Sequence, residues 1–380
     1  MTDKKRRPVF SLLLAGLLVL MALALAACGD SEPRTADQAS GSDTSEAATS
    51  DTGGESTTGE LSASLDGAGA TFPEPLYLEW IGEYTNTVQP GVSINYQGIG
   101  SGGGIEQFTQ QTVDFGASDA PMKDEELQAA QEAWGAEIFH IPTVFGAVSL
   151  AYNLEGVDSL QLTPEVLAGI FLGEITNWNA PAIAAANEGT ELPDQAIQVV
   201  HRSDSSGTTN IFTGYMAQIS DTWDSQVGAG KTVEWPVGVG GQGNDGVAAV
   251  IQQQSGSIGY VELSYALESG LPVASLQNAA GNFIEPTLDS TAAAAEGVEF
   301  PADLRFSVSN SDSPQAYPIV GATWILVASS GYEPDAAAAL RDFLTWSLTE
   351  GDALARDLNY APVPQNLEDL ALQKVDAITG

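Results

Sequence analysis

Polar side chains are concentrated in the run HRSDSSGTTN, which occupies positions 201–210. Arg202 offers a planar cation that can make two parallel hydrogen bonds to an oxyanion, and nearby hydroxyls can donate to the same ligand. His201, Asp204 and Ser206 could instead form the triad of a serine hydrolase. Three near neighbours on one strand and turn rarely reach triad geometry, and no G-x-S-x-G motif occurs in the sequence. The run therefore favours anion binding over catalysis.

The elements expected around this run support anion binding. IQVVHR has the composition of a strand, SDSSG is typical of a turn, and TTNIFTGYM is typical of a helix. The first turn of such a helix would present the backbone N–H groups of Ser206, Gly207 and Thr208. Because helix N-termini bind anions, these groups and Arg202 are expected to share one ligand.

Two neighbours of Arg202 have supporting roles in this interpretation. Asp204 either orients the guanidinium or is a solvated surface carboxylate, and the sequence leaves both alternatives open. His201 lies on the opposite face of the strand, where we expect an exposed or structural histidine rather than a catalytic one.

Two more junctions have the same chemistry. GAGATFPEP at 67–75 leads into a helix through Thr71, and YQGIGSGGGIEQF at 96–108 places Ser101 before a helix. Each alone is also compatible with an ordinary capped helix. The second contains G-x-G-x-x-G, which makes a dinucleotide site an alternative, although the match is weak in so glycine-rich a run. Three such junctions together predict one shared anion site.

Asp119, in VDFGASDAPM, decides which anion is expected. A carboxylate beside an anion is repulsive unless the ligand carries a proton that the carboxylate can accept. Hydrogen phosphate carries such a proton near neutral pH and sulfate does not, so Asp119 would discriminate between them. A turn-forming aspartate that caps the next helix is the alternative.

The rest of the sequence predicts an α/β protein with mainly parallel sheets, because strand and helix patterns alternate. Strands are expected at 92–97, 112–117, 144–153, 197–202, 257–262 and 323–328. Helices are expected at 74–85, 104–111, 164–172, 208–219, 245–253 and 334–348.

The first 60 residues have a different character. Basic residues at 4–7 precede an apolar run at 9–27 that ends in LAAC. This order predicts a lipoprotein signal peptide at 1–27 with lipidation of Cys28, and a permanent transmembrane helix is the alternative. Apart from Cys28 and Pro33, residues 28–60 contain no apolar side chain larger than alanine, so we expect a disordered tether there.

The amino-acid composition limits which cofactors and binding partners we expect. Cys28 is the only cysteine and His140 and His201 are the only histidines, so we expect neither an intramolecular disulfide nor a metal centre, and no cofactor. The net charge of −38 argues against binding nucleic acid. It also repels anions at long range, although salt screens that repulsion beyond roughly 10 Å.

Several motifs together resemble one family. GAGATFPEPLYLEW, INYQGIGSGGG, VDFGASDAPM, HRSDSSGTT, WPVGVGGQGNDGVAAVIQ and SIGYVE occur in the order found in the phosphate-binding proteins of bacterial phosphate ABC transporters. The similarity extends from about Leu65 to Pro364. It implies an α/β, two-domain type II periplasmic-binding-protein fold that closes like a hinge on phosphate in an interdomain cleft, then delivers it to membrane permease subunits.

The resemblance also implies the ligand set and the domains. The phosphate-binding residues would be Thr71, Phe72 (backbone N–H), Ser101, Asp119, Arg202, Ser206, Gly207 (backbone N–H) and Thr208. Domain 1 would comprise 61–145 and 310–380, and domain 2 would comprise 146–309. The tract WPVGVGGQGNDG is expected to form a packed turn and a helix start without a ligand role.

Two positions depart from the family pattern. The family often has a second serine at the place of Gly102 and a basic residue at the place of His201. Neither position belongs to the expected ligand set. Sulfate, molybdate or a phosphonate remains an alternative ligand, and a secreted hydrolase is a more distant one.

Overall fold

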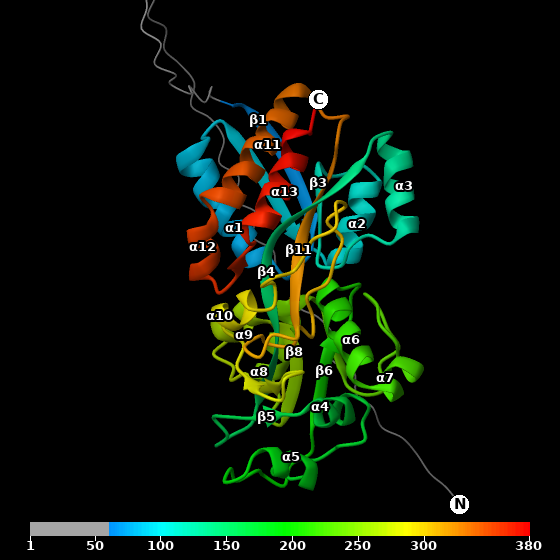
Figure 1. Cartoon of the computed structure of the whole chain (residues 1–380), viewed down its shortest axis with the longest axis vertical. Helices are drawn as coiled ribbons and strands as arrows, with labels where there is room; N and C mark the ends of the chain where they lie inside the picture. Colours follow the sequence, from blue (N-terminus) through cyan, green and yellow to red (C-terminus); the bar gives the residue numbers. More distant parts are fainter. Residues whose placement is uncertain (1–60) are drawn as a thin grey trace, which may run out of the picture. The chain divides into compact units, whose positions relative to one another are not determined.

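The computed structural model describes residues 61–380 (Figure 1). The predicted signal peptide, the predicted lipidation site at Cys28 and the predicted tether lie outside the described residues. Within 61–380, no helix is both long enough and apolar enough to span a bilayer.

The main sheet contains nine strands in the order β2-β1-β3-β11-β4-β8-β6-β7, with β12 paired to β4. A separate small sheet has the order β10-β9-β5. The strand bounds in chain order are β1 Ala63–Gly69, β2 Val92–Gly98, β3 Phe115–Ser118, β4 Ile138–Asn153, β5 Gln161–Leu162, β6 Gln198–Arg202, β7 Val239–Gly241, β8 Ser257–Glu262, β9 Ser275–Gln277, β10 Phe283–Ile284, β11 Val320–Ala328 and β12 Ala361–Pro362.

Helices cover the sheet. Their bounds are α1 Glu74–Glu83, α2 Ser101–Thr109, α3 Asp124–Trp134, α4 Pro164–Phe171, α5 Pro181–Ala186, α6 Gly207–Ile219, α7 Asp221–Gln226, α8 Gly243–Gln253, α9 Leu263–Glu268, α10 Leu288–Ala292, α11 Pro334–Thr349, α12 Asp352–Asp357 and α13 Gln365–Asp376, with one π-helical stretch, η1 Tyr84–Val88. We call the elements around β1, β2 and β3 the first lobe, and those around β6, β7 and β8 the second lobe (Figure 1).

Strand β4 belongs to both lobes. Its residues 138–147 pair with β11 in the first lobe, and its residues 148–153 pair with β8 in the second. All but the last of its 16 residues are buried, so it reads as a nearly continuous apolar run rather than an alternating one. The two lobes are therefore joined by hydrogen-bonded strands at the centre of one sheet.

The prediction of mainly parallel sheets was only partly right. β1 pairs with β2 and β3 in parallel, and β6 pairs with β7 and β8 in parallel. However, β11 and β4 run antiparallel to every neighbour that they have in the main sheet. β11 enters the first lobe from the second and β4 enters the second lobe from the first, and the reversed direction of these strands is not visible in local composition.

Expected and observed elements agree best where the apolar pattern is strong. The strand expected at 257–262 has the bounds of β8, and the helices expected at 164–172 and 334–348 end within one residue of α4 and α11. The helix expected from position 104 begins three residues earlier, at Ser101. Strand β1, ASLDGAG, was not predicted, because small and polar residues hide its pattern.

Candidate functional site

Three strand-to-helix junctions meet between the lobes. Thr71 and Phe72 follow β1, Ser101 begins α2, and Ser206 is the N-cap of α6, with its hydroxyl accepting from the backbone N–H of Thr209 at 3.0 Å. The predicted residues at these junctions and nearby are at most 3% exposed: Thr71, Phe72, Ser101, Asp119, Arg202, Ser206 and Thr208. The structure thus brings polar groups that are distant in sequence into one buried region.

Ser101 and Gly207 connect the lobes directly. The backbone N–H of Gly207 donates to Ser101 Oγ at 3.0 Å. A side chain at position 207 has no room, since a Cβ there would lie 2.4 Å from Ser101 Oγ and 2.6 Å from Asp119 Cβ. Glycine is therefore required for the start of α6 to approach the first lobe this closely.

Position 102, one of the two departures from the family pattern, also lies at this contact. The N–H of Gly102 donates to the carbonyl of Ser205 at 2.9 Å. A Cβ at position 102 would lie 2.2 Å from Ser205 Oγ and 2.4 Å from Ser205 Cβ. In this chain glycine at 102 is thus matched to the side chain at 205.

Asp119 follows β3 and has hydroxyl neighbours. Thr323 Oγ1 donates to Asp119 Oδ1 at 2.8 Å, and the backbone N–H of Asp119 donates to Ser101 Oγ at 3.1 Å. Burial raises the pKa of Asp119 to about 7, against the opposing influence of the Thr323 hydrogen bond and the charge of Arg202. The charge of this carboxyl therefore changes near neutral pH.

Arg202, at the end of β6, is held by Asp204. Its Nε donates to Asp204 Oδ1 at 2.8 Å and its Nη2 donates to Oδ2 at 2.5 Å, while Nη1 donates to Thr208 Oγ1 at 3.3 Å. The N–H of Gly243 also donates to Asp204, at 3.1 Å. Burial alone would raise the pKa of Asp204, but the bonds and charge of Arg202 outweigh it and lower the pKa. Asp204 therefore orients the guanidinium rather than facing solvent.

His201 has a structural environment, as expected. Its ring stacks on Trp235 with centroids 4.7 Å apart, and its Nδ1 lies 3.0 Å from the carbonyl oxygen of Arg202. Burial lowers its pKa. With Ser206 capping α6 and Asp204 paired to Arg202, the three residues do not form a Ser–His–Asp triad.

Asn244, in the first turn of α8, was missed. Its side chain is completely buried, and Nδ2 donates to Thr71 Oγ1 at 2.9 Å and to Thr208 Oγ1 at 3.2 Å. It lies in the tract for which no ligand role was expected. The sequence pattern could have pointed to Asn244, because this tract is a fourth glycine-rich turn between a strand and the start of a helix.

A second buried carboxyl lies behind the first junction. Tyr360 Oη donates to the carbonyl of Phe72 at 2.6 Å and lies 2.9 Å from Glu262 Oε2. Burial raises the pKa of Glu262 to about 8. Glu262 and Tyr360 thereby hold the backbone at Phe72, whose N–H is one of the predicted ligands.

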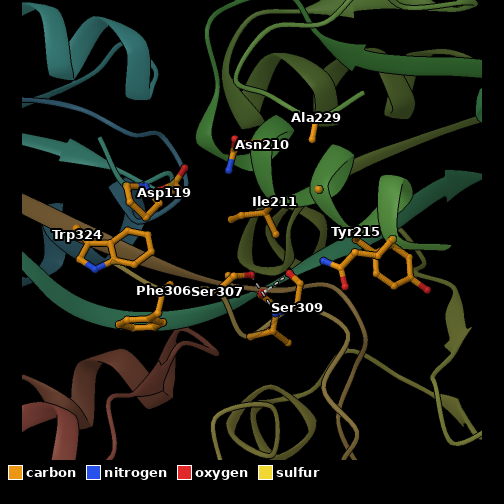
Figure 2. Close-up of a pocket in the computed structure, with 15 residues that line it drawn as sticks. Asp119, Asn210, Ile211, Tyr215, Ala229, Phe306, Ser307, Ser309 and Trp324 are labelled. Atoms are coloured by element: carbon orange, nitrogen blue, oxygen red, sulfur yellow. Dashed lines mark hydrogen bonds between the residues drawn. The ribbon is translucent and has the colours of Figure 1, made fainter. Parts of the chain in front are cut away.

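A cavity of about 270 Å³ lies beside Asp119 (Figure 2). Asp119 and Trp324 of the first lobe and residues of α6, among them Asn210 and Ile211, line it. Its wall is thus shared by the two lobes. Among residues 61–380, no group of three or more histidine, cysteine or acidic side chains is arranged to hold a metal ion.

Two α/β lobes that share a central sheet and enclose buried hydrogen-bond donors define the class of periplasmic binding proteins. In agreement, residues 42–350 match the family profile described as a PBP superfamily domain.

Comparison with curated relatives identifies the family within this class. The phosphate-binding protein PstS of Pasteurella multocida is 42% identical over 318 residues, which cover 83% of this chain and 89% of the relative. Phosphate-binding protein PstS 3 of Mycobacterium tuberculosis is 35% identical over 371 residues, covering 96% of this chain and 97% of the relative. This chain belongs to the PstS family of phosphate-binding proteins.

Solved structures agree on the fold. A periplasmic phosphate-binding protein solved with phosphate has a TM-score of 0.66 at 24% identity, over 80% of this chain and 92% of that chain. A human phosphate binding apolipoprotein has a TM-score of 0.68 at 23% identity, over 80% of this chain and 92% of its own. The fold is the α/β type II periplasmic-binding-protein fold that the family resemblance implied.

Proposed function

We propose that this protein captures inorganic phosphate between its two lobes and delivers it to the permease of a phosphate ABC transporter. Arg202 supplies the fixed positive charge. Thr71, Ser101, Ser206 and Thr208 supply hydroxyls, and Phe72 and Gly207 supply backbone N–H groups. Binding and release suffice for this role, and no catalytic step is part of it.

Asp119 is the single observation that carries the choice of ligand. It is a buried carboxyl between Ser101 and Thr323, and as a carboxylate it can accept a hydrogen bond from the P–O–H group of hydrogen phosphate. Sulfate offers no such proton and would face the carboxylate as an uncompensated like charge. The arrangement therefore supports phosphate over sulfate or molybdate.

The test is a calorimetric titration of the purified protein with phosphate, sulfate and arsenate in parallel at pH 8. We expect tight binding of phosphate, with sulfate at least about 100-fold weaker, because an unpaired buried charge costs about 3 kcal/mol or more. Equal affinity for sulfate would refute the role given to Asp119. Binding of none of the three anions would refute the function.

The domain division belongs to the same proposal. We place domain 1 at 61–145 and 310–380, and domain 2 at 146–309. The change of partner along β4, from β11 at Ala147 to β8 at Val148, supports a hinge near the first boundary.

We also propose that the protein is extracytoplasmic and anchored to the cell membrane by lipid on Cys28. The basic residues at 4–7, the apolar run at 9–27 and the LAAC sequence support this location. Growth of cells that express the full chain or its Cys28→Ala variant with a labelled fatty acid tests it. We expect label in the full chain and none in the variant, and a full chain without label would refute the anchor.

A further inference from the structure

Asn244 makes contacts that determine more than packing. Its Oδ1 accepts a hydrogen bond from the backbone N–H of Glu262 at 3.0 Å. Only an oxygen can accept that bond, so the side-chain amide has one orientation and its NH₂ group faces Thr71 and Thr208. Each of the two protons of Nδ2 then has its own threonine hydroxyl as acceptor.

These contacts restrict which hydrogen bonds the hydroxyls of the two threonines can still make. A hydroxyl has two acceptor positions and one proton. Thr71 Oγ1 accepts from both the backbone N and Nδ2 of Asn244, at 3.2 and 2.9 Å. Thr208 Oγ1 accepts from Arg202 Nη1 at 3.3 Å and from Asn244 Nδ2 at 3.2 Å. With both acceptor positions used, each hydroxyl can only donate to its next partner.

We propose that Asn244 is a positioning residue that directs the hydroxyl protons of Thr71 and Thr208 toward the bound anion. This inference rests on the proposed function, since an oxyanion is the acceptor that receives both protons. Without Asn244 each hydroxyl would rotate between donating and accepting, and part of the binding free energy would be lost in fixing it.

The same contact couples donation to closure. Thr71 belongs to the first lobe, whereas Asn244 and Thr208 belong to the second. The proton of Thr71 is therefore directed only when the lobes are together, while that of Thr208 is directed within one lobe. Closing supplies the anion with a donor that the separated lobes do not offer.

The test compares Asn244→Leu, which removes both side-chain donors without adding charge, with Asn244→Asp, which turns donors into acceptors. Asn187→Asp is the matched control, because Asn187 is a buried asparagine of the second lobe whose Nδ2 donates to the carbonyls of Gln161 and Ile183. Thermal melting reports folding, and calorimetry reports phosphate affinity. We expect Asn187→Asp to bind within about twofold of wild type, Asn244→Leu about 10- to 100-fold more weakly, and Asn244→Asp more weakly still.

A mutant cycle repeats Asn244→Leu in a protein that already carries Thr71→Val and Thr208→Val. It distinguishes the orientation of the hydroxyl protons from a general effect of Asn244 on packing. In that background we expect Asn244→Leu to weaken phosphate affinity less than about threefold, because no hydroxyl remains to be directed. An undiminished cost in that background, or an Asn244→Leu protein that binds like wild type, would overturn the inference. Sulfate and arsenate titrated alongside separate this result from the proposed function: a wild type that prefers sulfate refutes phosphate selectivity alone, and one that binds no oxyanion overturns both.

Discussion

At the scale of single residues, the site combines one permanent charge with one switchable charge. Arg202 is buried, and its permanently charged guanidinium forms an ion pair with Asp204. Asp119 has a pKa of about 7, so its charge varies within the physiological range. Selectivity is therefore expected to vary with pH even though the positive charge does not.

The first prediction concerns this pH dependence. Below about pH 7 a protonated Asp119 becomes a donor, so sulfate meets a hydrogen bond instead of a like charge. We expect the preference for phosphate over sulfate to fall as the pH is lowered from 8 to 6, measured by competition calorimetry. Asp119→Asn, whose amide donates at every pH, should lose both the preference and most of its pH dependence. An unchanged preference in wild type across this range would contradict the prediction.

The raised pKa of Asp119 also makes the free energy of unfolding depend on pH. In the unfolded chain Asp119 releases its proton near its ordinary pKa of 3.8, but the folded protein keeps it to about 7. Folding therefore takes up a proton between these pH values, and the contribution to stability falls as the pH rises through that window. A bound ligand that donates to the carboxylate compensates for this loss.

Sequence reasoning proposed Thr71, Ser101 and Arg202 because each lies at or near a junction between a strand and a helix. It could not settle whether Asp204 orients Arg202 or faces solvent, since that depends on the N–H of Gly243, 39 positions away. Asn244 was missed for the same reason, because its partners Thr71 and Thr208 come from other junctions. The local sequence pattern identifies where a helix starts, whereas contacts between helix starts that are distant in sequence are known only from the folded structure.

At the scale of elements, one ion pair ties the lobes together beside the site. Lys231, between α7 and β7, contacts Glu126 of α3 at 2.6 Å, and their side chains are 10% and 29% exposed. The carbonyl of Lys231 also accepts from the N–H of Ser206 at 2.9 Å, so the segment is attached to the start of α6. The pair forms only when the two lobes meet.

The second prediction tests this pair. Lys231→Met or Glu126→Gln should weaken phosphate binding about two- to fivefold by favouring the open form, and the double variant should lose no more than either alone. Calorimetry at low and high salt measures the effect. Asp352→Asn, which removes the exposed Arg356–Asp352 pair within α12, is the control and should bind as wild type does. Additive losses in the double variant would show that the pair does not act as a unit.

At the scale of the whole molecule, the net charge of −38 opposes the arrival of an anion. The site overcomes this repulsion at hydrogen-bond distance through buried donors, which salt screens little. Long-range charge therefore governs how fast the ligand arrives, and short-range contacts govern how long it remains.

The third prediction follows from that separation. Raising KCl from about 10 to 150 mM shortens the screening length from roughly 30 to 8 Å, so phosphate association should accelerate while dissociation changes little. Stopped-flow tryptophan fluorescence measures both rates. Association that slows with added salt would show that local positive charge dominates capture.

The path of the chain through the sheet also sets an order of assembly. The second lobe is built from one contiguous stretch between β4 and β11, whereas β4 meets its first-lobe partner only when Val320–Ala328 has been made. Because contacts between distant segments form slowly, the second lobe should fold first and the first lobe should complete afterwards. Pulse-labelled hydrogen exchange should protect β6 and β8 before β11, whose partners β3 and β4 lie far away in the sequence; simultaneous protection would contradict this order. Arg202 would then be in place before Thr323 reaches Asp119, so the last strand to arrive would bring the hydroxyl that holds the carboxyl on which the choice between anions depends.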